Sequence, residues 1–329
     1  MTRKLVIAGM PESGKSTFLI ALRHLLIFHE VQTALRATRL SDFEKHLNEL
    51  EEKWIACEPV KRTKQTVEEW VSLHVRREAD STEAEIMVPD FSGEAFRRPA
   101  ATGNCSPAIA RMLSELDGLL LFTNADRSAD DVRLEPLAAL LSDDAAATVD
   151  GAVVGAIAVP DRQGETAGTG LAGSQTIAQQ RGPGNGQVAA DQADPHNPIP
   201  FDPVNMPEEA LLVELLQILN RRPRFPKKRV IAVIVSAWDV VEEPALSPEQ
   251  WLEQNRPMLW QYLLNNNDLW TLRVYGVSAQ GGKLPEEKTA LQAKTPGQRV
   301  QVVGHGAQPH DLTAPIDWLM TESASDGHA

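Results

Sequence analysis

Runs of apolar residues recur along the chain and predict buried strands. A continuous apolar run is typical of a strand that is covered on both faces, as in a parallel sheet. Such runs cover residues 5–8, 119–122 and 230–235, and residues 272–277 are expected to form a last strand. Residues 70–76 and 84–88 have alternating or apolar character and predict two more strands, joined by a turn at Asp80-Ser81-Thr82.

Apolar positions that recur every three or four residues predict helices between these strands. Helices are expected from about residue 15, over residues 41–54 and 107–116, from residues 207 and 247, and over residues 313–320. Ser247-Pro248-Glu249-Gln250 resembles a capping box, and Pro257 is expected to kink or interrupt the helix that this box opens. The alternation of strands and helices predicts an α/β fold with a doubly wound sheet.

Residues 143–205 differ in composition from the rest of the chain, because they are rich in Ala, Gly, Gln, Asp and Pro and almost free of aromatic residues. Such a segment cannot bury enough apolar surface to offset the entropy that is lost on ordering. We therefore predict a flexible insertion at 143–205. It would divide one folded domain into a first part, residues 1–142, and a second part, residues 206–322. Residues 323–329 are expected to form a disordered tail.

The formal net charge is −13, and acidic and basic residues are interspersed. Nucleic acids and anionic membranes attract clustered Lys and Arg, so neither is expected as the main partner. Cys57 and Cys105 are isolated and lack metal-ligand spacing, which is typical of reduced thiols. No apolar stretch approaches the roughly 20 residues that span a bilayer, and the N-terminal run is too short for a signal sequence. A cytoplasmic location is expected.

The segment from Gly9 to Thr17 carries the pattern Gly-x-x-x-x-Gly-Lys-Ser between a predicted strand and a predicted helix. In this context the pattern is typical of a phosphate-binding loop. Gly9 and Gly14 permit a close backbone approach that a Cβ atom would obstruct, so successive N–H groups can point at phosphate oxygens. The amino end of the helix adds partial positive charge at the same place. The alternative is a glycine turn with an exposed lysine.

Other positions of this loop have expected roles of their own. Lys15 supplies a full positive charge to the β and γ phosphates, and the Ser16 hydroxyl is expected to bind Mg²⁺. Thr17 would pack or line the α-phosphate side. Glu12 and Ser13 are counted with the nucleotide-binding loop, although the chemistry does not require the Glu12 carboxylate, whose alternative is a solvated loop side chain.

Asp90-Phe91-Ser92-Gly93 directly follows the predicted strand 84–88 and is a candidate metal and γ-phosphate element. Asp90 would lie at the carboxyl end of that strand, where α/β sheets bind ligands, and would hold Mg²⁺ through water. The Gly93 N–H would contact the γ-phosphate and release it after hydrolysis. Taken alone, the pattern also fits a simple turn.

A threonine upstream of residue 70 is expected to sense the γ-phosphate and to bind the metal. Thr66 is the first choice and Thr63 the second, because both lie in the polar, basic connector before the predicted strand. The alternative for each is an ordinary surface threonine, and the sequence does not separate the two.

Four segments occur in the order that is typical of P-loop GTPases of the Ras-like, translation-factor class (TRAFAC), which the sequence resembles over most of its length outside the insertion. They are Gly9 to Ser16, Asp90 to Gly93, Ser236-Ala237-Trp238-Asp239 and Ser278-Ala279-Gln280. The resemblance implies the P-loop NTPase fold, a three-layer α/β/α sandwich with a mostly parallel sheet. It also implies binding of GTP or GDP with Mg²⁺.

By this resemblance, Asp239 accepts hydrogen bonds from guanine N1 and N2. Ser278 and Ala279 belong to the guanine loop, with the Ala279 N–H facing O6. Ser236 and Ala237 replace the usual Asn and Lys, however, and this removes the aliphatic stem that normally covers the base. Guanine selectivity is therefore implied but not secured, and the alternative for Asp239 is a capping or turn aspartate.

Hydrolysis is expected to be slow. Ras-like proteins orient the attacking water with a Gln at the position of Glu94. A Glu side chain can accept a hydrogen bond from water but cannot donate one, and its charge would repel the γ-phosphate. Arg97 and Arg98 would either stabilise charge or simply be solvated. The expected catalytic residues are Lys15, Thr66, Gly93 and Glu94.

The irregular guanine motif, the long insertion and the ending Pro315-Ile316-Asp317-Trp318-Leu319 resemble the bacterial double-GTPase group. Members of that group are thought to work beside a second GTPase and accessory proteins in bacterial conflict or defence systems. The expected function is a GTP-dependent switch that is read by a protein effector or a second GTPase. Two alternatives stay open: a P-loop ATPase or kinase in which Asp239 is incidental, and an ATP-binding regulatory module with little intrinsic hydrolysis.

Overall fold

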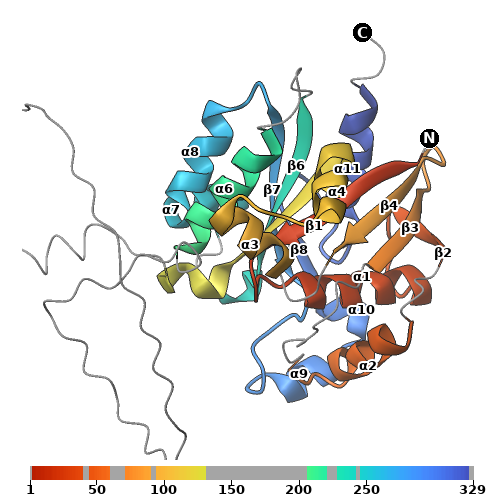
Figure 1. Cartoon of the computed structure of the whole chain (residues 1–329). Coiled ribbons are helices and arrows are strands. Elements are labelled where there is room, and N and C mark those ends of the chain that lie inside the picture. Colours follow the sequence, from red (N-terminus) through yellow and green to blue (C-terminus); the bar gives the residue numbers. More distant parts are fainter. Residues whose placement is uncertain are drawn as a thin grey trace, which may run out of the picture. The chain divides into compact units, whose positions relative to one another are not determined.

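A twisted sheet with helices on both faces forms the frame of the protein (Figure 1). The computed structural model describes residues 2–39, 44–59, 71–89, 94–130, 206–220, 228–241 and 245–325. Within these ranges the sheet has eight strands in the order β2-β3-β4-β1-β5-β6-β7-β8. The predicted fold class, an α/β sandwich of three layers with a mostly parallel sheet, is confirmed.

The central strands of the sheet are parallel, and its two margins are antiparallel. Strands β4, β1, β5, β6 and β7 pair in parallel, whereas β2 with β3, β3 with β4 and β7 with β8 pair antiparallel. The strands are β1 (Arg3–Gly9), β2 (Leu35–Arg39), β3 (Val71–Arg77), β4 (Glu83–Val88), β5 (Gly118–Asn124), β6 (Arg229–Ser236), β7 (Trp270–Ser278) and β8 (Gln301–Val303). The carboxyl ends of the five parallel strands therefore meet at one edge of the sheet.

All of the predicted helices are present, with shifts at their ends. The helices are α1 (Lys15–Phe28), α2 (Glu44–Ile55), α3 (Glu94–Thr102), α4 (Pro107–Glu115), α6 (Glu208–Asn220), α7 (Pro248–Asn255), α8 (Pro257–Asn265), α9 (Lys288–Gln292), α10 (Pro296–Arg299) and α11 (Ala314–Ser325). Short 3₁₀ turns follow two strands, η1 (Ala125–Asp130) after β5 and η3 (Trp238–Val240) after β6. Strands β2 and β8 and helices α3, α9 and α10 were not predicted.

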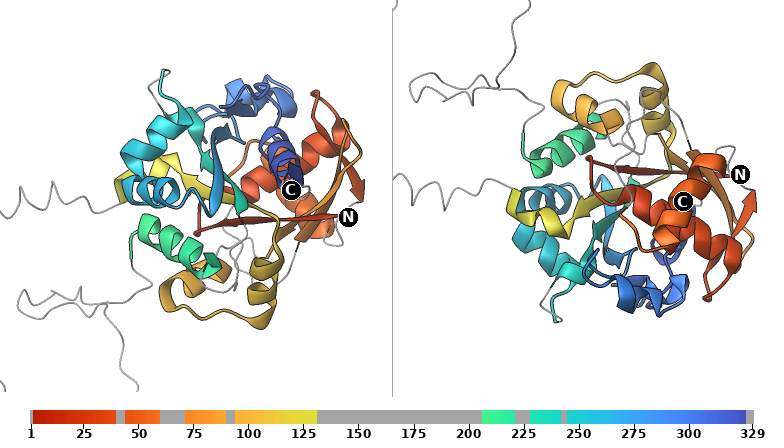
Figure 2. Two further views of the ribbon diagram at one scale, coloured as in Figure 1. Left: turned by 90° about the horizontal axis from the view of Figure 1, so that it is seen from above. Right: turned by 90° about the horizontal axis from the view of Figure 1, so that it is seen from below.

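Successive side chains of each central strand enter two different hydrophobic cores, because neighbouring residues of a strand point to opposite faces. Leu5 and Ile7 of β1 pack with α1, α2 and α11, whereas Val6 and Ala8 pack with α3, α4, α6, α7 and α8. Figure 2 shows these two sets of helices on opposite sides of the strands. Burial on both faces explains why the central strands are continuous apolar runs in the sequence.

The predicted capping box and proline break between β6 and β7 are both confirmed. The Gln250 N–H donates to Ser247 Oγ at 3.2 Å, and the Ser247 N–H donates to Gln250 Oε1 at 2.9 Å. Helix α7 ends at Asn255, and α8 starts at Pro257, because proline cannot donate a backbone hydrogen bond within a helix. Within the described ranges, no helix is both long and apolar enough to cross a bilayer.

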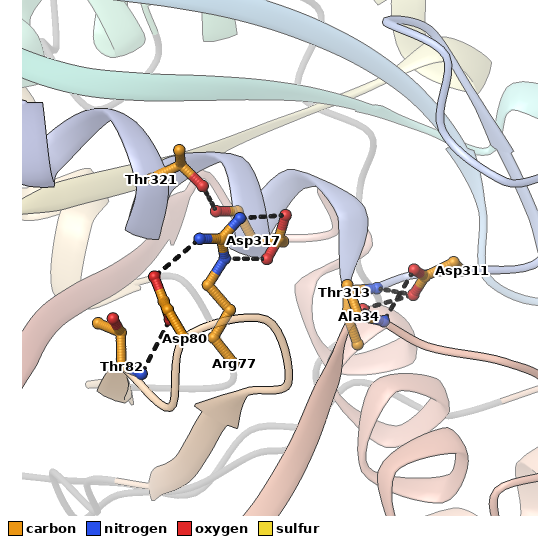
Figure 3. Close-up of polar contacts among 8 residues, drawn as sticks. All are labelled: Ala34, Arg77, Asp80, Thr82, Asp311, Thr313, Asp317 and Thr321. Atoms are coloured by element: carbon orange, nitrogen blue, oxygen red, sulfur yellow. Dashed lines mark hydrogen bonds and ion pairs between the residues drawn. The ribbon is translucent and has the colours of Figure 1, made fainter.

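Helix α11 is tied by polar contacts to the β2–β3 margin of the sheet (Figure 3). Arg77 Nε of β3 donates to Asp317 Oδ1 of α11 at 2.6 Å, and Arg77 NH1 donates to Asp80 Oδ2 at 2.9 Å. The Asp311 carboxylate accepts from the Thr313 N–H at 2.8 Å and from the Ala34 N–H at 3.2 Å. Burial raises the pKa of the Asp311 carboxyl, although the hydrogen bonds from Thr313 and Ala34 oppose the shift.

Candidate functional site

A cavity of about 680 Å³ lies where β1, β5, β6 and β7 end. Cavities of this size are typical of small-molecule and cofactor sites. Most of the predicted site residues line it, although they come from three loops that are far apart in the chain. Those that line it are Glu12, Ser13, Gly14, Lys15, Ser16 and Thr17 after β1, Asp239 after β6, and Ser278 and Ala279 after β7.

The loop after β1 needs glycine at both ends of its motif. A Cβ atom on Gly9 would lie 2.8 Å from the Phe122 carbonyl oxygen of β5, and one on Gly14 would lie 2.7 Å from Ser236 Oγ of β6. Gly14 also has a left-handed backbone with φ 86°, as does Glu12 with φ 63°. The loop can therefore lie close against the neighbouring strands only with these two glycines.

Lys15 is folded back over this loop, and its ammonium is buried. The side chain is 3 % exposed. Its Nζ donates to the carbonyl oxygens of Gly9 at 2.9 Å and Met10 at 2.7 Å, and to Ser13 Oγ at 3.0 Å. A buried charge is stable only with such partners. The loop thus holds a positive charge beside the cavity, together with the amino end of α1.

Residues at the ends of β5 and β6 hold the loop in place. Ser236 Oγ lies 2.9 Å from the Ser13 carbonyl oxygen, close enough to donate to it. Asn124 Nδ2 donates to the Glu12 carbonyl oxygen at 2.9 Å, and Arg127 NH1 lies 3.4 Å from the Glu12 carboxylate. The Glu12 side chain therefore has an ion-pair partner in η1, rather than water alone.

The loops after β6 and β7 are joined through Asp239 and Ser278. Ser278 Oγ donates to Asp239 Oδ1 and accepts from the Gly281 N–H at 2.9 Å. The Trp238 ring covers Gly276 of β7, where a Cβ atom would lie 2.3 Å from the ring. Ala237 has a left-handed backbone with φ 52° and also lines the cavity. These contacts fix the carboxylate of Asp239 at the cavity wall.

Comparison with known proteins identifies the family. Residues 6–319 match the family described as Double-GTPase 1. The chain belongs to this family. The predicted resemblance to double GTPases of the P-loop class is therefore confirmed, and the chain is a GTPase-type P-loop protein.

Solved structures that resemble this Double-GTPase 1 chain include translation-factor-like GTPase domains. The Ski7 GTPase-like domain of S. cerevisiae, bound to GTP, has 12 % sequence identity and a TM-score of 0.42, and the match covers 98 % of this chain and 50 % of that one. The same domain bound to GDP and inorganic phosphate has 12 % sequence identity and a TM-score of 0.43, and the match covers 98 % of this chain and 50 % of that one. The bacterial selenocysteine-specific elongation factor EF-Sec has 12 % sequence identity and a TM-score of 0.33, and the match covers 90 % of this chain and 29 % of that one.

The chain thus spans half or less of the length of these solved chains. No curated protein matches the sequence.

Several predicted site residues of this Double-GTPase 1 chain lie outside the described residues. They are Thr63, Thr66, Asp90 and Gly93. Glu94 is the first residue of α3, but its side chain also lies outside the described part. Val88, the last residue of β4, ends a strand that pairs in parallel with β1, so the chain leaves β4 at the edge that carries the phosphate loop. Arg97 and Arg98 lie on α3, which packs on α6.

Several residues at or near the cavity were not predicted from the sequence. Asn124, the last residue of β5, and Asp126, in η1, line the cavity, and their position after a predicted buried strand was the available signal. Residues 282–284 and Glu286, beyond the loop after β7, line it as well. Trp54 of α2 donates its indole N–H to the Ala279 carbonyl oxygen at 3.0 Å, behind the loop that follows β7. No sequence pattern relates Trp54 to Ala279, because the contact depends on how α2 packs.

Proposed function

We propose that this Double-GTPase 1 chain binds GTP and GDP with Mg²⁺, hydrolyses GTP slowly and acts as a switch that a protein partner reads. One observation carries the proposal: a single cavity joins the Lys15 loop to Asp239, Ser278 and Ala279. The Lys15 loop suits a triphosphate. Asp239, Ser278 and Ala279 suit a purine that offers hydrogen-bond donors on one edge.

The phosphate side of the cavity supports a nucleoside triphosphate. The Lys15 ammonium, now held by loop carbonyl oxygens, would also meet the β and γ phosphates. Backbone N–H groups from Ser13 to Thr17 and the amino end of α1 would bind the remaining phosphate oxygens. Gly9 and Gly14 keep the loop close enough to the sheet for this contact.

The hydroxyl of Ser16, in the phosphate loop, would fit as one ligand of a magnesium site. The Ser16 hydroxyl lines the cavity beside Lys15 and would bind the ion, together with Asp90 and Thr66 as proposed from the sequence. When bound, Mg²⁺ would neutralise charge on the phosphate oxygens.

The base side of the cavity supports guanine rather than adenine. The Asp239 carboxylate would accept from guanine N1–H and the 2-amino group, which adenine does not present in the same way. Ser278 keeps that carboxylate in place by donating to it. The Ala279 N–H would donate to O6, an acceptor in guanine where adenine carries an amino group.

Competition binding tests base selectivity. Wild-type protein is expected to bind GTP at least about tenfold more tightly than ATP. A difference of this size is expected because adenine would lose one or two hydrogen bonds to the charged Asp239 carboxylate. Asp239→Asn should weaken GTP binding and strengthen binding of XTP, because xanthine carries a carbonyl at C2 where guanine carries an amino group. A preference of the wild type for ATP would contradict the proposal and favour the ATPase or ATP-binding module.

Slow hydrolysis is proposed because Glu94 takes the position of a water-orienting Gln. Single-turnover hydrolysis of GTP should become faster in Glu94→Gln, since the amide can both accept and donate and carries no charge. Fast hydrolysis that is unchanged in Glu94→Ala would remove any catalytic role for this residue.

The proposed partner is an effector or a second GTPase, in line with the description of the family as a double GTPase. Turnover of GTP should rise when the partner GTPase is added. The control is the same mixture with Lys15→Ala, which isolates turnover by the partner alone. Equal turnover in both mixtures would contradict a role for this chain in partner-dependent hydrolysis.

A further inference from the structure

Helix α2 reaches the loop after β7 through one buried side chain. Trp54, in the last turn of α2, is fully buried, and its Nε1 donates to the Ala279 carbonyl oxygen at 3.0 Å. Ala279 and the following residue, Gln280, both line the cavity, whereas Trp54 does not. The tryptophan therefore holds this loop from outside the cavity.

The Trp54 ring is itself fixed by Arg299 at the end of α10. The Arg299 guanidinium lies 5.0 Å from the ring centroid, and its NH1 donates to the Ile55 carbonyl oxygen at 3.3 Å. The Arg299 carbonyl oxygen lies against Gly281, where a Cβ atom would be only 2.3 Å away and where φ is 90°. Arg299 thus contacts both Trp54 and the loop that Trp54 holds.

Helix α2 is also joined to α1, the helix that starts at the phosphate loop. The Glu51 carboxylate of α2 accepts from Arg23 and lies 2.7 Å from His24 Nδ1. Arg23 NH2 donates to Asn48 Oδ1 at 2.8 Å. Arg23, His24 and Glu51 are buried, so α1 and Arg299 both restrain the position of Trp54.

The Trp54 hydrogen bond restricts the rotation of the peptide between Ala279 and Gln280. The carbonyl and the N–H of a trans peptide point in opposite directions. Because Trp54 holds the carbonyl on the α2 side, the Gln280 N–H is turned away from α2. The Ala279 N–H is restrained from the other end of the residue by Ser278, whose hydroxyl is bonded to Asp239.

We propose that Trp54 is a positioning residue for base recognition. By holding the Ala279 carbonyl, its indole orients the Gln280 N–H of the same peptide toward O6 of a bound purine, beside the Ala279 N–H that Ser278 restrains. This inference rests on the proposed function. The loop after β7 is thereby held in one conformation at the base, although Ala237 in the loop after β6 lacks the Lys stem that usually covers the base.

The variant Trp54→Phe tests this role, because it keeps an aromatic ring beside Arg299 and removes the N–H donor. It also removes part of a buried ring, and a second buried tryptophan serves as the control for that loss of volume. Affinity for GTP should fall about three- to tenfold, as expected for one hydrogen bond. Affinity for ATP should stay within about twofold, because ATP would use the phosphate loop and not O6 recognition. The ratio of the two affinities separates this role from a general loss of structure.

Trp318→Phe is a matched control. Trp318 is a buried tryptophan of α11, 5 % exposed, and the Arg273 guanidinium lies 4.9 Å from its ring. It packs in the same core as Trp54. The substitution should leave both nucleotide affinities unchanged.

The outcomes distinguish this inference from the proposed function. A wild-type protein without a preference for GTP over ATP overturns both. A wild-type preference that survives in Trp54→Phe, or a variant that loses GTP and ATP affinity equally, overturns the role of Trp54 alone.

A measurement on the wild-type chain covers the case in which Trp54→Phe does not fold. With ¹⁵N-labelled tryptophan, the Trp54 indole resonance can be assigned by elimination among the seven tryptophans. It should shift on addition of GDP and not on addition of ADP. Equal shifts with both nucleotides, or none with GDP, would overturn the role.

Discussion

Lys15 has the most sharply defined surroundings of the proposed site residues. Its ammonium is buried against two loop carbonyl oxygens and the Ser13 hydroxyl, next to the amino end of α1. Such a group is a fixed positive charge that water does not screen strongly. Every nucleotide hypothesis for this chain therefore depends on it.

Lys15→Ala should abolish binding of GTP and ATP alike, with a loss of about 100-fold or more, since it removes a charge-assisted contact to phosphate. Isothermal titration calorimetry measures both affinities. Lys4→Ala is the control, because Lys4 pairs with Glu115 on the surface at 2.6 Å. Nucleotide binding retained in Lys15→Ala would contradict all of the nucleotide hypotheses.

Asp311 should make stability depend on pH in an unusual direction. Burial raises the pKa of its carboxyl in the folded protein, so the folded state binds the proton more tightly than the unfolded chain does. The contribution of Asp311 to the free energy of unfolding is therefore largest at low pH and falls as pH rises through the folded pKa.

Asp311→Asn removes the titrating group, and its amide oxygen can still accept from the Thr313 N–H. Its NH2 group cannot accept from the Ala34 N–H, which donates to the other carboxylate oxygen. The variant therefore loses a constant amount of stability, and only the change with pH is compared. Urea unfolding of both proteins should be measured from about pH 4 to about pH 7. The stability of the wild type relative to Asp311→Asn should decrease over this range. An increase would show that the folded state favours the charged carboxylate.

At the level of the elements, the N-terminus of α7 is determined by residues that are neighbours in the sequence. Its capping box lies within four consecutive residues, and both reciprocal hydrogen bonds form. The break between α7 and α8 is equally local, since Pro257 alone ends the hydrogen-bond pattern. Such elements can be predicted because the residues that determine them are neighbours in sequence.

Ser247→Ala should lower the free energy of unfolding by about 1 kcal/mol, because the Gln250 N–H loses its acceptor. Denaturant unfolding measures the change. Ser114→Ala is a suitable control, since Ser114 is exposed on α4 and its hydroxyl bonds only within its own helix, to the Arg111 carbonyl oxygen. That control is expected to stay within about 0.5 kcal/mol of the wild type, and equal losses in both variants would rule out a special role of the cap.

The elements that were not predicted are those that depend on their place in the sheet. β2 is a marginal strand with the mostly polar sequence Leu35-Arg36-Ala37-Thr38-Arg39, and it exists because it can pair with β3. β8 has only three residues and pairs with the end of β7. Helix α3 contains Pro99, and a proline inside a segment makes a helix unexpected because it cannot donate a backbone hydrogen bond.

At the level of the whole molecule, each of the two hydrophobic cores contains residues from before and from after segment 143–205. β5 and β6 pair directly over Gly118–Asn124 and Arg229–Ser236, and α6 lies on the connection between them. The predicted insertion is therefore not needed to complete the β5–β6 pairing.

Replacing residues 143–205 with a flexible Gly-Ser linker should leave the folded domain intact. The affinity for GTP should stay within about twofold of the full chain. Calorimetry and thermal unfolding of the two proteins check this. A large loss of binding or of cooperative unfolding would mean that the segment is part of the nucleotide-binding domain.

By itself, the sequence determined the strand, the glycine loop and the helix at the N-terminus, the central buried strands, and the resemblance that the family match confirms. These features follow from neighbouring residues: an apolar run, the spacing of Gly9 and Gly14, and helical periodicity after Lys15. Local sterics and burial on both faces of the sheet are enough to specify them.

Only the tertiary structure decided which side chains support the proposed site from behind. The contact of Trp54 with Ala279 joins residues 225 positions apart, and that of Ser236 with Ser13 joins residues 223 apart. Such contacts arise from the order of the strands, from the packing of α2 on α1 and from the contact of Arg299 with Trp54. No periodicity along the chain encodes them, because they depend on the distances between elements rather than on the residues within one.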